Sequence, residues 1–283
     1  MADPVFVLGA ARSGTSAVSQ ALLKTRYTGF NEGHIIGLLT TINDQISSYF
    51  ERYKNVPDSK VILVKNTSKS EVIFEYNQAF KKIFENLHDN YEYILDKTPT
   101  IIGLSAIPHL LDIWPDAKII YCQRRGLEVV RSALIKWPNA GIENRGPAWA
   151  DMVEMWQNKM ADLAGNFLMI EHIELTYSPD KVSRALQEFL NLEPEEGAIL
   201  SAEFADRRFE VTSETYHPVD EADLPWSPED REIFDQICAK SMLAGGYSYD
   251  PGYFLPGPRR DEIMDLIGLP RSTKISTEMS NKP

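Results

Sequence analysis

The feature that most constrains the fold lies at the start of the chain, where an apolar run is followed by a turn rich in small residues. Val5 to Leu8 are apolar and predict a buried strand, and the pattern from Ser16 to Lys24 predicts a helix. Gly9 and Gly14 lie in the turn between them. Because the backbone N–H groups of such a turn point toward one spot at the positive end of the helix dipole, the turn is predicted to bind an anion.

The spacing of the two glycines matches that of a phosphate-binding loop. Nucleoside triphosphatases carry a lysine and then a serine or threonine directly after the second glycine, whereas this chain has Thr15 and Ser16 there. The cation lies inside the loop instead, as Arg12. We therefore predict a phosphate loop that is not of the ATPase kind. An ordinary strand-turn-helix connection built from small residues is the alternative.

The composition limits the partners and the compartment. With 283 residues, 43% of them hydrophobic, the chain is long enough for one α/β domain with a full core. A formal net charge of −12 argues against nucleic acid or a heavily sulfated polymer as the main partner, because both need a basic surface. Cys122 and Cys238 are too few for a disulfide framework. With no apolar leader and no apolar run near ~18 residues, we expect a cytoplasmic protein without a membrane partner.

Predicted strands and helices alternate along the chain. This favours a mostly parallel, P-loop-like α/β sheet covered by helices on both faces, in a three-layer sandwich. After the first strand, strands are expected over 27–30, 61–64, 91–95, 118–123 and 167–170. After the first helix, helices are expected over 35–53, 71–87, 103–113, 126–134, 149–163, 179–190 and 229–243. Segments 136–147 and 193–228 are predicted to be irregular. One domain is expected over 1–250, followed by a partly mobile tail over 251–283.

Four polar clusters follow the predicted strands, namely residues 9–16, 31–34, 96–99 and 124–126. In parallel sheets the binding crevice lies beyond the carboxyl ends of the strands, so these clusters are expected to meet there. Arg12 with the loop amides would hold one anionic group. Arg124 and Arg125 would form a second cationic point, with Ser132 two helical turns further on. The arrangement predicts a ligand with two phosphate-type groups. The alternative is that the paired arginines only neutralise surface carboxylates.

Four stretches, taken in order, resemble the motifs of the sulfotransferase family that uses 3′-phosphoadenosine 5′-phosphosulfate (PAPS). Residues 9–16 look like its 5′-phosphosulfate loop, and residues 120–132 resemble its 3′-phosphate motif, in which a serine lies eight residues after an arginine. Residues 96–99 and 171–192 resemble two further segments of the family. The 3′-phosphate motif departs from the family pattern at Arg125, Gly126 and Glu128. The Arg-Lys-Gly loop of cytosolic members is missing, so the outline is closer to the bacterial and carbohydrate-type branches.

This resemblance implies a PAPS-dependent sulfotransferase that transfers a sulfuryl group to a hydroxyl of a small molecule or carbohydrate, with no metal. The donor would be held by Ala11, Arg12, Ser13, Gly14, Thr15, Ser16, Arg124 and Ser132. Arg12 would replace the loop lysine of the family, and Lys97 could supply a proton to the leaving group. Glu32 is expected to be the general base, as a glutamate is in tyrosyl and several bacterial members. His34 is the competing candidate.

The sequence also allows two other functions. One is a P-loop kinase that phosphorylates a small molecule with ATP, against which the missing lysine after Gly14 counts. The other is a nucleotide-binding protein on the same fold that has lost catalysis, which the altered loop cation and Gly126 favour. The acceptor and the oligomeric state are not predicted.

Overall fold

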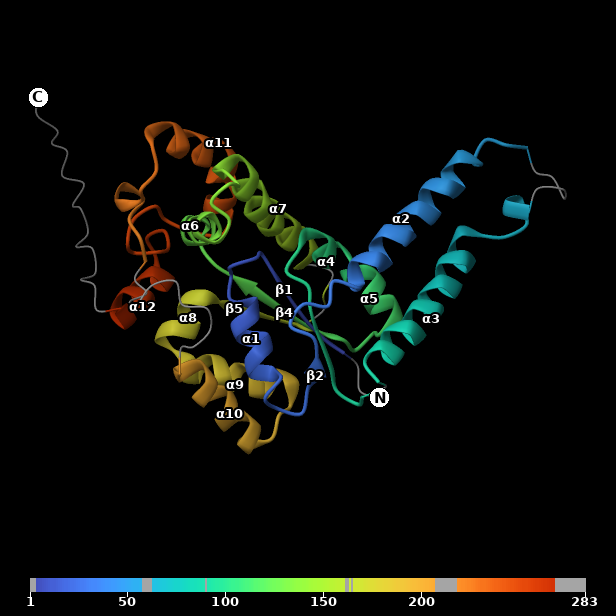
Figure 1. Ribbon diagram of the computed structural model, residues 1–283, viewed down its shortest axis with the longest axis horizontal. Helices are drawn as coiled ribbons and strands as arrows, with labels where there is room; N and C mark the ends of the chain where they lie inside the picture. The colour runs from blue at the N-terminus through green and yellow to red at the C-terminus, as the bar shows by residue number, and fades with distance from the viewer. Residues whose placement is uncertain are drawn as a thin grey trace, which may run out of the picture.

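A sheet of five parallel strands forms the centre of the protein (Figure 1). The structure is a computed structural model that describes residues 4–57, 63–89, 91–160, 163, 165–206 and 218–267. In spatial order the strands are β2 (Thr28–Gly29), β3 (Ile94–Lys97), β1 (Val5–Gly9), β4 (Lys118–Gln123) and β5 (Phe167–Glu171). In the register of the sheet, Val5 lies opposite Leu95 on one side and Lys118 on the other. The predicted parallel α/β sheet is confirmed.

Helices occupy the connections between the strands. Those before β4 are α1 (Thr15–Leu22), α2 (Ile36–Arg52), the short 3-10 helix η1 (Leu63–Lys65), α3 (Lys69–Leu87), α4 (Ile101–Ser105) and α5 (Ile107–Ile113). Those after β4 are α6 (Gly126–Lys136), α7 (Ile142–Met160), α8 (His172–Tyr177), α9 (Pro179–Leu190), α10 (Pro194–Ala205), η2 (Glu221–Asp223), α11 (Pro228–Ala244) and α12 (Pro258–Ile267).

The sheet separates two hydrophobic cores, because successive side chains of a strand point to opposite faces. Phe6 and Leu8 of β1 belong to a core shared with α4 to α7 and α11. Val5 and Val7 of the same strand belong to a second core, shared with α1, α9 and α10. Figure 1 shows these two groups of helices above and below the sheet. This is the predicted three-layer arrangement.

Helices α2 and α3 form a hairpin that projects away from the sheet (Figure 1). Inside the hairpin, Asn43 Nδ2 donates to Asn77 Oδ1 at 3.0 Å, and both side chains are buried. Such a buried polar pair favours one register of the two helices over others. Ile36 and Leu39 are fully buried at the base of α2. The hairpin is therefore anchored next to residues 31–34, one of the predicted polar clusters.

The predicted loop over 136–147 is wrong in its second half, where α7 already begins at Ile142. Pro147 lies inside this helix. As the sixth residue of the helix it removes one backbone hydrogen bond, and its ring crowds the carbonyl of Glu143, a cost that the packing of the helix must offset. Gly146 also serves packing, because a Cβ atom there would lie 3.2 Å from Cys238 Sγ of α11. Small and helix-breaking residues here permit close contact between α7 and α11.

The predicted irregular segment over 193–228 contains α10, so that prediction is wrong too. Its acidic residues form a helix start: Glu193 and Glu196 make a reciprocal capping box. Leu200 and Phe204 then bury the apolar side of the helix. Of the predicted strand over 61–64, residues 61 and 62 lie outside the described residues, and the chain from Leu63 on is the 3-10 helix η1.

Residues 251–267 pack onto the domain. Tyr253 and Phe254 are buried, and Phe254 forms an antiparallel bridge with Tyr247. The remaining part of the expected tail, 268–283, lies outside the described residues. Among the helices that the structure describes, none combines the length and the apolar character needed to cross a bilayer.

Candidate active site

The turn after β1 has the geometry of an anion-binding loop. Gly14 caps α1 in a left-handed conformation, with φ 97°, and Arg12 is also left-handed, with φ 74°. The buried Ser13 Oγ lies 2.6 Å from the carbonyl oxygen of Ala10 and 2.8 Å from that of Cys122, which ties the loop to β4. The first N–H groups of α1 have no partners within the helix and are directed at the space above the loop.

Arg12 connects the loop to the second predicted anion site. Its Nε donates to Ser132 Oγ of α6 at 2.9 Å, and its carbonyl oxygen accepts a hydrogen bond from Arg124 Nη1 at 3.0 Å. Two guanidinium groups and a serine hydroxyl therefore gather at the carboxyl end of β4. The residues of the two anion sites expected from the sequence therefore adjoin each other, since Arg12 of the first contacts Ser132 and Arg124 of the second.

The turn from β4 to α6 is supported from behind by Trp149. The indole Nε1 donates to the carbonyl oxygen of Arg124 at 2.9 Å. A Cβ atom on Gly126 would lie 2.8 Å from the Trp149 ring, so a glycine is needed for this close packing. The departure from the family motif at Gly126 thus has a structural reason: the indole occupies the space of a side chain.

Lys97, at the end of β3, links the loop to Glu32. Its Nζ donates to Ser16 Oγ at 2.9 Å and lies 3.1 Å from Glu32 Oε1. The other carboxylate oxygen, Oε2, lies 3.0 Å from His34 Nε2. The hydrogen bond with His34 and the contact with Lys97 lower the pKa of Glu32, although partial burial opposes the shift. Glu32 is 53% exposed whereas Lys97 is 3% exposed, so the carboxylate faces outward from a buried cation.

The loop that carries Glu32 and His34 is held by β3 and the residues after it. The N–H of Gly33 donates to the carbonyl oxygen of Lys97 at 3.1 Å. The N–H of His34, which has a left-handed φ of 55°, donates to Thr98 Oγ1 at 3.1 Å. Thr98 in turn donates to the buried carboxylate of Asp96 at 2.8 Å.

Asp96 also explains the glycine between Glu32 and His34. A Cβ atom on Gly33 would lie 1.7 Å from Asp96 Oδ2, so any side chain there would have to displace the buried Asp96 carboxylate. Burial raises the pKa of Asp96. The position of Glu32 is therefore set by the last residues of β3 and by Thr98 directly after them.

All the residues singled out from the sequence thus lie along one edge of the sheet. Arg12, Arg124 and Ser132 meet at one end, and Lys97, Ser16, Glu32 and His34 meet at the other, with the loop between them. A sequence profile described as the sulfotransferase family matches residues 4–196.

The chain belongs to the sulfotransferase family.

Solved sulfotransferases share the fold. Sulfotransferase STF9 from Mycobacterium avium is 15% identical, with a TM-score of 0.52 over 86% of this chain and 76% of that one. Mouse sulfotransferase SULT7A1, solved in complex with PAP, is 14% identical, with a TM-score of 0.50 over 93% and 89%. A sulfotransferase from Alicyclobacillus acidocaldarius is 13% identical, with a TM-score of 0.50 over 96% and 98%. No curated protein sequence matches the chain.

In this member of the family, His172 lies beside the loop after β1, although the sequence pattern did not single it out. It begins α8, directly after β5, and a Cβ atom on Gly14 would lie 3.1 Å from its ring. Burial, and then the charges of Arg124 and Arg12, hold its pKa well below the usual value. His172 is therefore a neutral imidazole against the phosphate loop. The sequence signal that could have identified His172 is its position directly after a predicted strand, at the carboxyl edge of the sheet.

Glu171, the residue before it, is a second buried group near the site. It is 1% exposed, and its carboxylate accepts hydrogen bonds from Tyr253 at 2.6 Å and Tyr247 at 2.8 Å. Burial raises its pKa to about 7, against the opposing influence of Arg259 and the two tyrosines. Within the part of the chain that the structure describes, no group of three or more His, Cys, Asp and Glu side chains could hold a metal ion.

Proposed function

We propose that this chain transfers a sulfuryl group from PAPS to a hydroxyl group of a small molecule or carbohydrate. The observation that carries the proposal is the paired arrangement of the site: Arg12, Arg124 and Ser132 at one end of the loop, and Lys97 beside Glu32 at the other. PAPS has a 3′-phosphate and a 5′-phosphosulfate, and this donor set offers cations and N–H groups for both. The relative solved with PAP supports the same choice of donor.

The donor supplies an activated sulfuryl group, and the residues of the chain position it and neutralise charge. Sulfuryl transfer resembles phosphoryl transfer, in which a loose transition state places charge on the leaving oxygen. The bond from sulfur to the 5′-phosphate oxygen breaks as the bond from sulfur to the acceptor oxygen forms. Lys97 Nζ, bonded to Ser16 Oγ at the start of α1, is placed to stabilise that leaving oxygen together with the loop amides.

Glu32 is the general base in this proposal. It is ionised at neutral pH and can accept the acceptor's proton, although its lowered pKa makes it a weaker base than an ordinary glutamate. It is half exposed, which gives an acceptor access that the buried Lys97 does not have. His34, in contact with the outer carboxylate oxygen, orients Glu32 and is the alternative base.

The kinase interpretation is disfavoured by the family match and by the missing lysine after Gly14. A turnover assay distinguishes an active enzyme from an inactive relative with the same fold. We would incubate the protein with PAPS radiolabelled in the sulfuryl group and a panel of alcohols and sugars. The proposal predicts transfer of label to at least one acceptor and loss of transfer in Glu32→Gln. Binding of adenosine 3′,5′-bisphosphate without transfer to any acceptor class would favour the inactive relative.

A further inference from the structure

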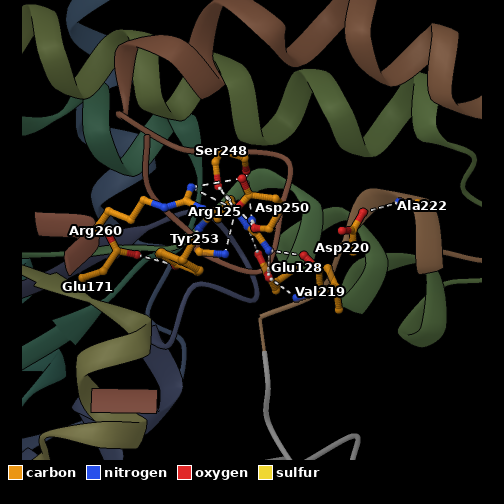
Figure 2. A network of polar contacts seen from close by, with 11 residues as sticks. Arg125, Glu128, Glu171, Val219, Asp220, Ala222, Ser248, Asp250, Tyr253 and Arg260 are labelled. Carbon is orange, nitrogen blue, oxygen red and sulfur yellow. Dashed lines mark hydrogen bonds and ion pairs between the residues drawn. The ribbon is translucent and has the colours of Figure 1, made fainter. Parts of the chain in front are cut away.

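Arg125, the residue after Arg124, is completely buried, and its guanidinium group is fully used. Nε and Nη2 lie 2.9 and 2.5 Å from the two carboxylate oxygens of the buried Glu128. Nη1 donates to the carbonyl oxygens of Ser248 and Asp250 at 2.9 and 2.6 Å, and Nη2 to that of Val219 at 2.6 Å. A guanidinium group has five N–H donors, and these five contacts account for all of them (Figure 2).

The backbone of Arg125 is held by the same part of the chain. Its N–H donates to the Tyr253 hydroxyl at 3.0 Å, and that hydroxyl lies 2.6 Å from Glu171 Oε1. The Tyr253 ring also lies beneath the guanidinium, with 5.0 Å from Cζ to the ring centre. One hydroxyl therefore connects the β4–α6 turn to the end of β5, next to His172.

The segment that makes these contacts is braced internally. Arg260 of α12 donates to a carboxylate oxygen of Asp250 at 3.0 Å and to the carbonyl oxygen of Phe254 at 2.8 Å. The N–H of Gly252 donates to Asp250 Oδ1 at 2.7 Å, which fixes the turn between these residues. Because these internal contacts make the segment rigid, it can hold the Arg125 side chain in one position.

We name Val219, Ser248, Asp250 and Tyr253 the C-terminal clamp, since they grip Arg125 from outside the residues 4–196 that match the family profile. Arg124 is the neighbour of Arg125 in the sequence, and its guanidinium group contacts the phosphate loop at the carbonyl oxygen of Arg12. Its direction depends on the backbone of the turn, which Trp149 holds at the Arg124 carbonyl and the clamp holds at the Arg125 N–H.

We propose that Arg125 and Tyr253 are positioning residues, through which the C-terminal clamp aims Arg124 at the 3′-phosphate of the donor. The inference rests on the proposed function. Neither residue touches the donor in this scheme. Their role is to fix the turn from behind, and the clamp gives this sulfotransferase a C-terminal support for a turn that departs from the family pattern at Arg125 and Gly126.

The test uses Tyr253→Phe, which removes one hydroxyl and keeps the ring. Arg125 itself is a poor choice, because its loss would leave Glu128 as a buried, unpaired charge. Tyr247→Phe is the matched control, since the Tyr247 hydroxyl also donates to Glu171, at 2.8 Å, but no hydrogen bond joins it to the Arg125 N–H. Affinities for adenosine 3′,5′-bisphosphate and adenosine 5′-phosphate are measured by calorimetry for wild type and both variants.

Tyr253→Phe loses the hydrogen bond from the Arg125 N–H as well as the one to Glu171. Loss of the contact with Arg125 should weaken binding of the bisphosphate by about 3- to 10-fold, with much less change for adenosine 5′-phosphate. Tyr247→Phe should discriminate between the two nucleotides as wild type does. Hydrogen exchange of the amides at the start of α6 should be faster in Tyr253→Phe alone. Equal weakening for both nucleotides, or unchanged discrimination in Tyr253→Phe, would overturn the positioning role. A wild-type protein that does not bind the bisphosphate would overturn the proposed function, and the clamp's role with it.

Discussion

Lys97 Nζ lies 3.1 Å from Glu32 Oε1, which joins the end of β3 to the loop after β2. A buried cation and a half-exposed carboxylate are thereby set side by side at the mouth of the phosphate loop. In the proposed mechanism the pair supplies two functions at one place: a positive charge for the leaving oxygen and a base for the incoming hydroxyl. Each function gives a separate prediction.

Glu32→Gln should lower the turnover rate by about 10²–10⁴-fold, the usual contribution of a general base. The amide keeps the size of the side chain and can still accept from Lys97, so affinity for adenosine 3′,5′-bisphosphate should stay nearly unchanged. Steady-state kinetics with excess acceptor, together with calorimetry, measure both quantities.

His34→Ala is the paired variant, and its effect on turnover near neutral pH should be much milder. Since the hydrogen bond with His34 is the largest cause of the lowered Glu32 pKa, removing it should shift the acid limb of the pH–rate profile to higher pH. If His34→Ala abolishes turnover while Glu32→Gln leaves it intact, the histidine is the base and the assignment is reversed.

Lys97→Met and Arg12→Met should affect different steps. Lys97 contacts Ser16 and Glu32, where charge develops, so its loss should lower the turnover rate by about 10²–10³-fold. Arg12 contacts Ser132 on the side of the second anion site, so its loss should mainly weaken donor binding. Measuring both the turnover rate and the donor affinity of each variant tests whether Lys97 acts on turnover and Arg12 on donor binding. Identical effects of both would mean that the two cations act on the same atom.

Arg124→Ala should weaken binding of adenosine 3′,5′-bisphosphate far more than binding of adenosine 5′-phosphate. A hydrogen bond to a charged group contributes about 1.5–3 kcal/mol, which corresponds to roughly a 10- to 150-fold loss for the bisphosphate. Titration calorimetry with the two nucleotides gives the ratio. An equal loss for both would show that Arg124 does not contact the 3′-phosphate.

The raised pKa of Glu171 predicts a pH dependence of stability. Its value of about 7 lies above the ordinary value of 4.5, so between these two pH values the folded protein holds a proton that the unfolded chain has released. The free energy of unfolding contributed by this group therefore falls as pH rises from about 4.5 to about 7, and is level above that. The total change is on the order of a few kcal/mol.

Urea denaturation of wild type and Glu171→Gln across that range measures this effect, because glutamine does not titrate. The difference in unfolding free energy between the two proteins should move in favour of Glu171→Gln as pH rises toward about 7. A difference that stays constant with pH would mean that the buried carboxyl keeps an ordinary pKa.

The sheet and the edge that carries the site could be predicted, because the strands are apolar runs followed directly by polar clusters. Val5 to Leu8 and Ile119 to Cys122 are buried on both faces of the sheet, and such strands are recognisable without knowledge of the fold. Glu32 comes shortly after β2 and Lys97 ends β3, and these two strands are parallel neighbours, so the meeting of the two side chains at one edge follows from the topology.

The start of α7 and the whole of α10 were not predicted, because proline, glycine and acidic residues are common in loops and at helix starts alike. Packing in the folded chain decides that both segments are helical: Gly146 packs against Cys238, and Phe204 lies in the second core. The contacts of Arg12 with Ser132 and of Arg125 with Ser248 join residues more than a hundred positions apart. No local pattern contains such contacts, so the C-terminal clamp appears only in the folded chain.

The most direct test of the account is calorimetric titration of the wild-type protein, in the presence of excess EDTA, with adenosine 3′,5′-bisphosphate, and separately with ATP and Mg²⁺ in the absence of chelator. Arg12, Arg124 and Ser132 are side chains suited to phosphates without a metal. We expect the bisphosphate to bind in EDTA more tightly than adenosine 5′-phosphate does, and more tightly than ATP with Mg²⁺ does. Binding of ATP that depends on Mg²⁺, with no binding of the bisphosphate, would contradict it.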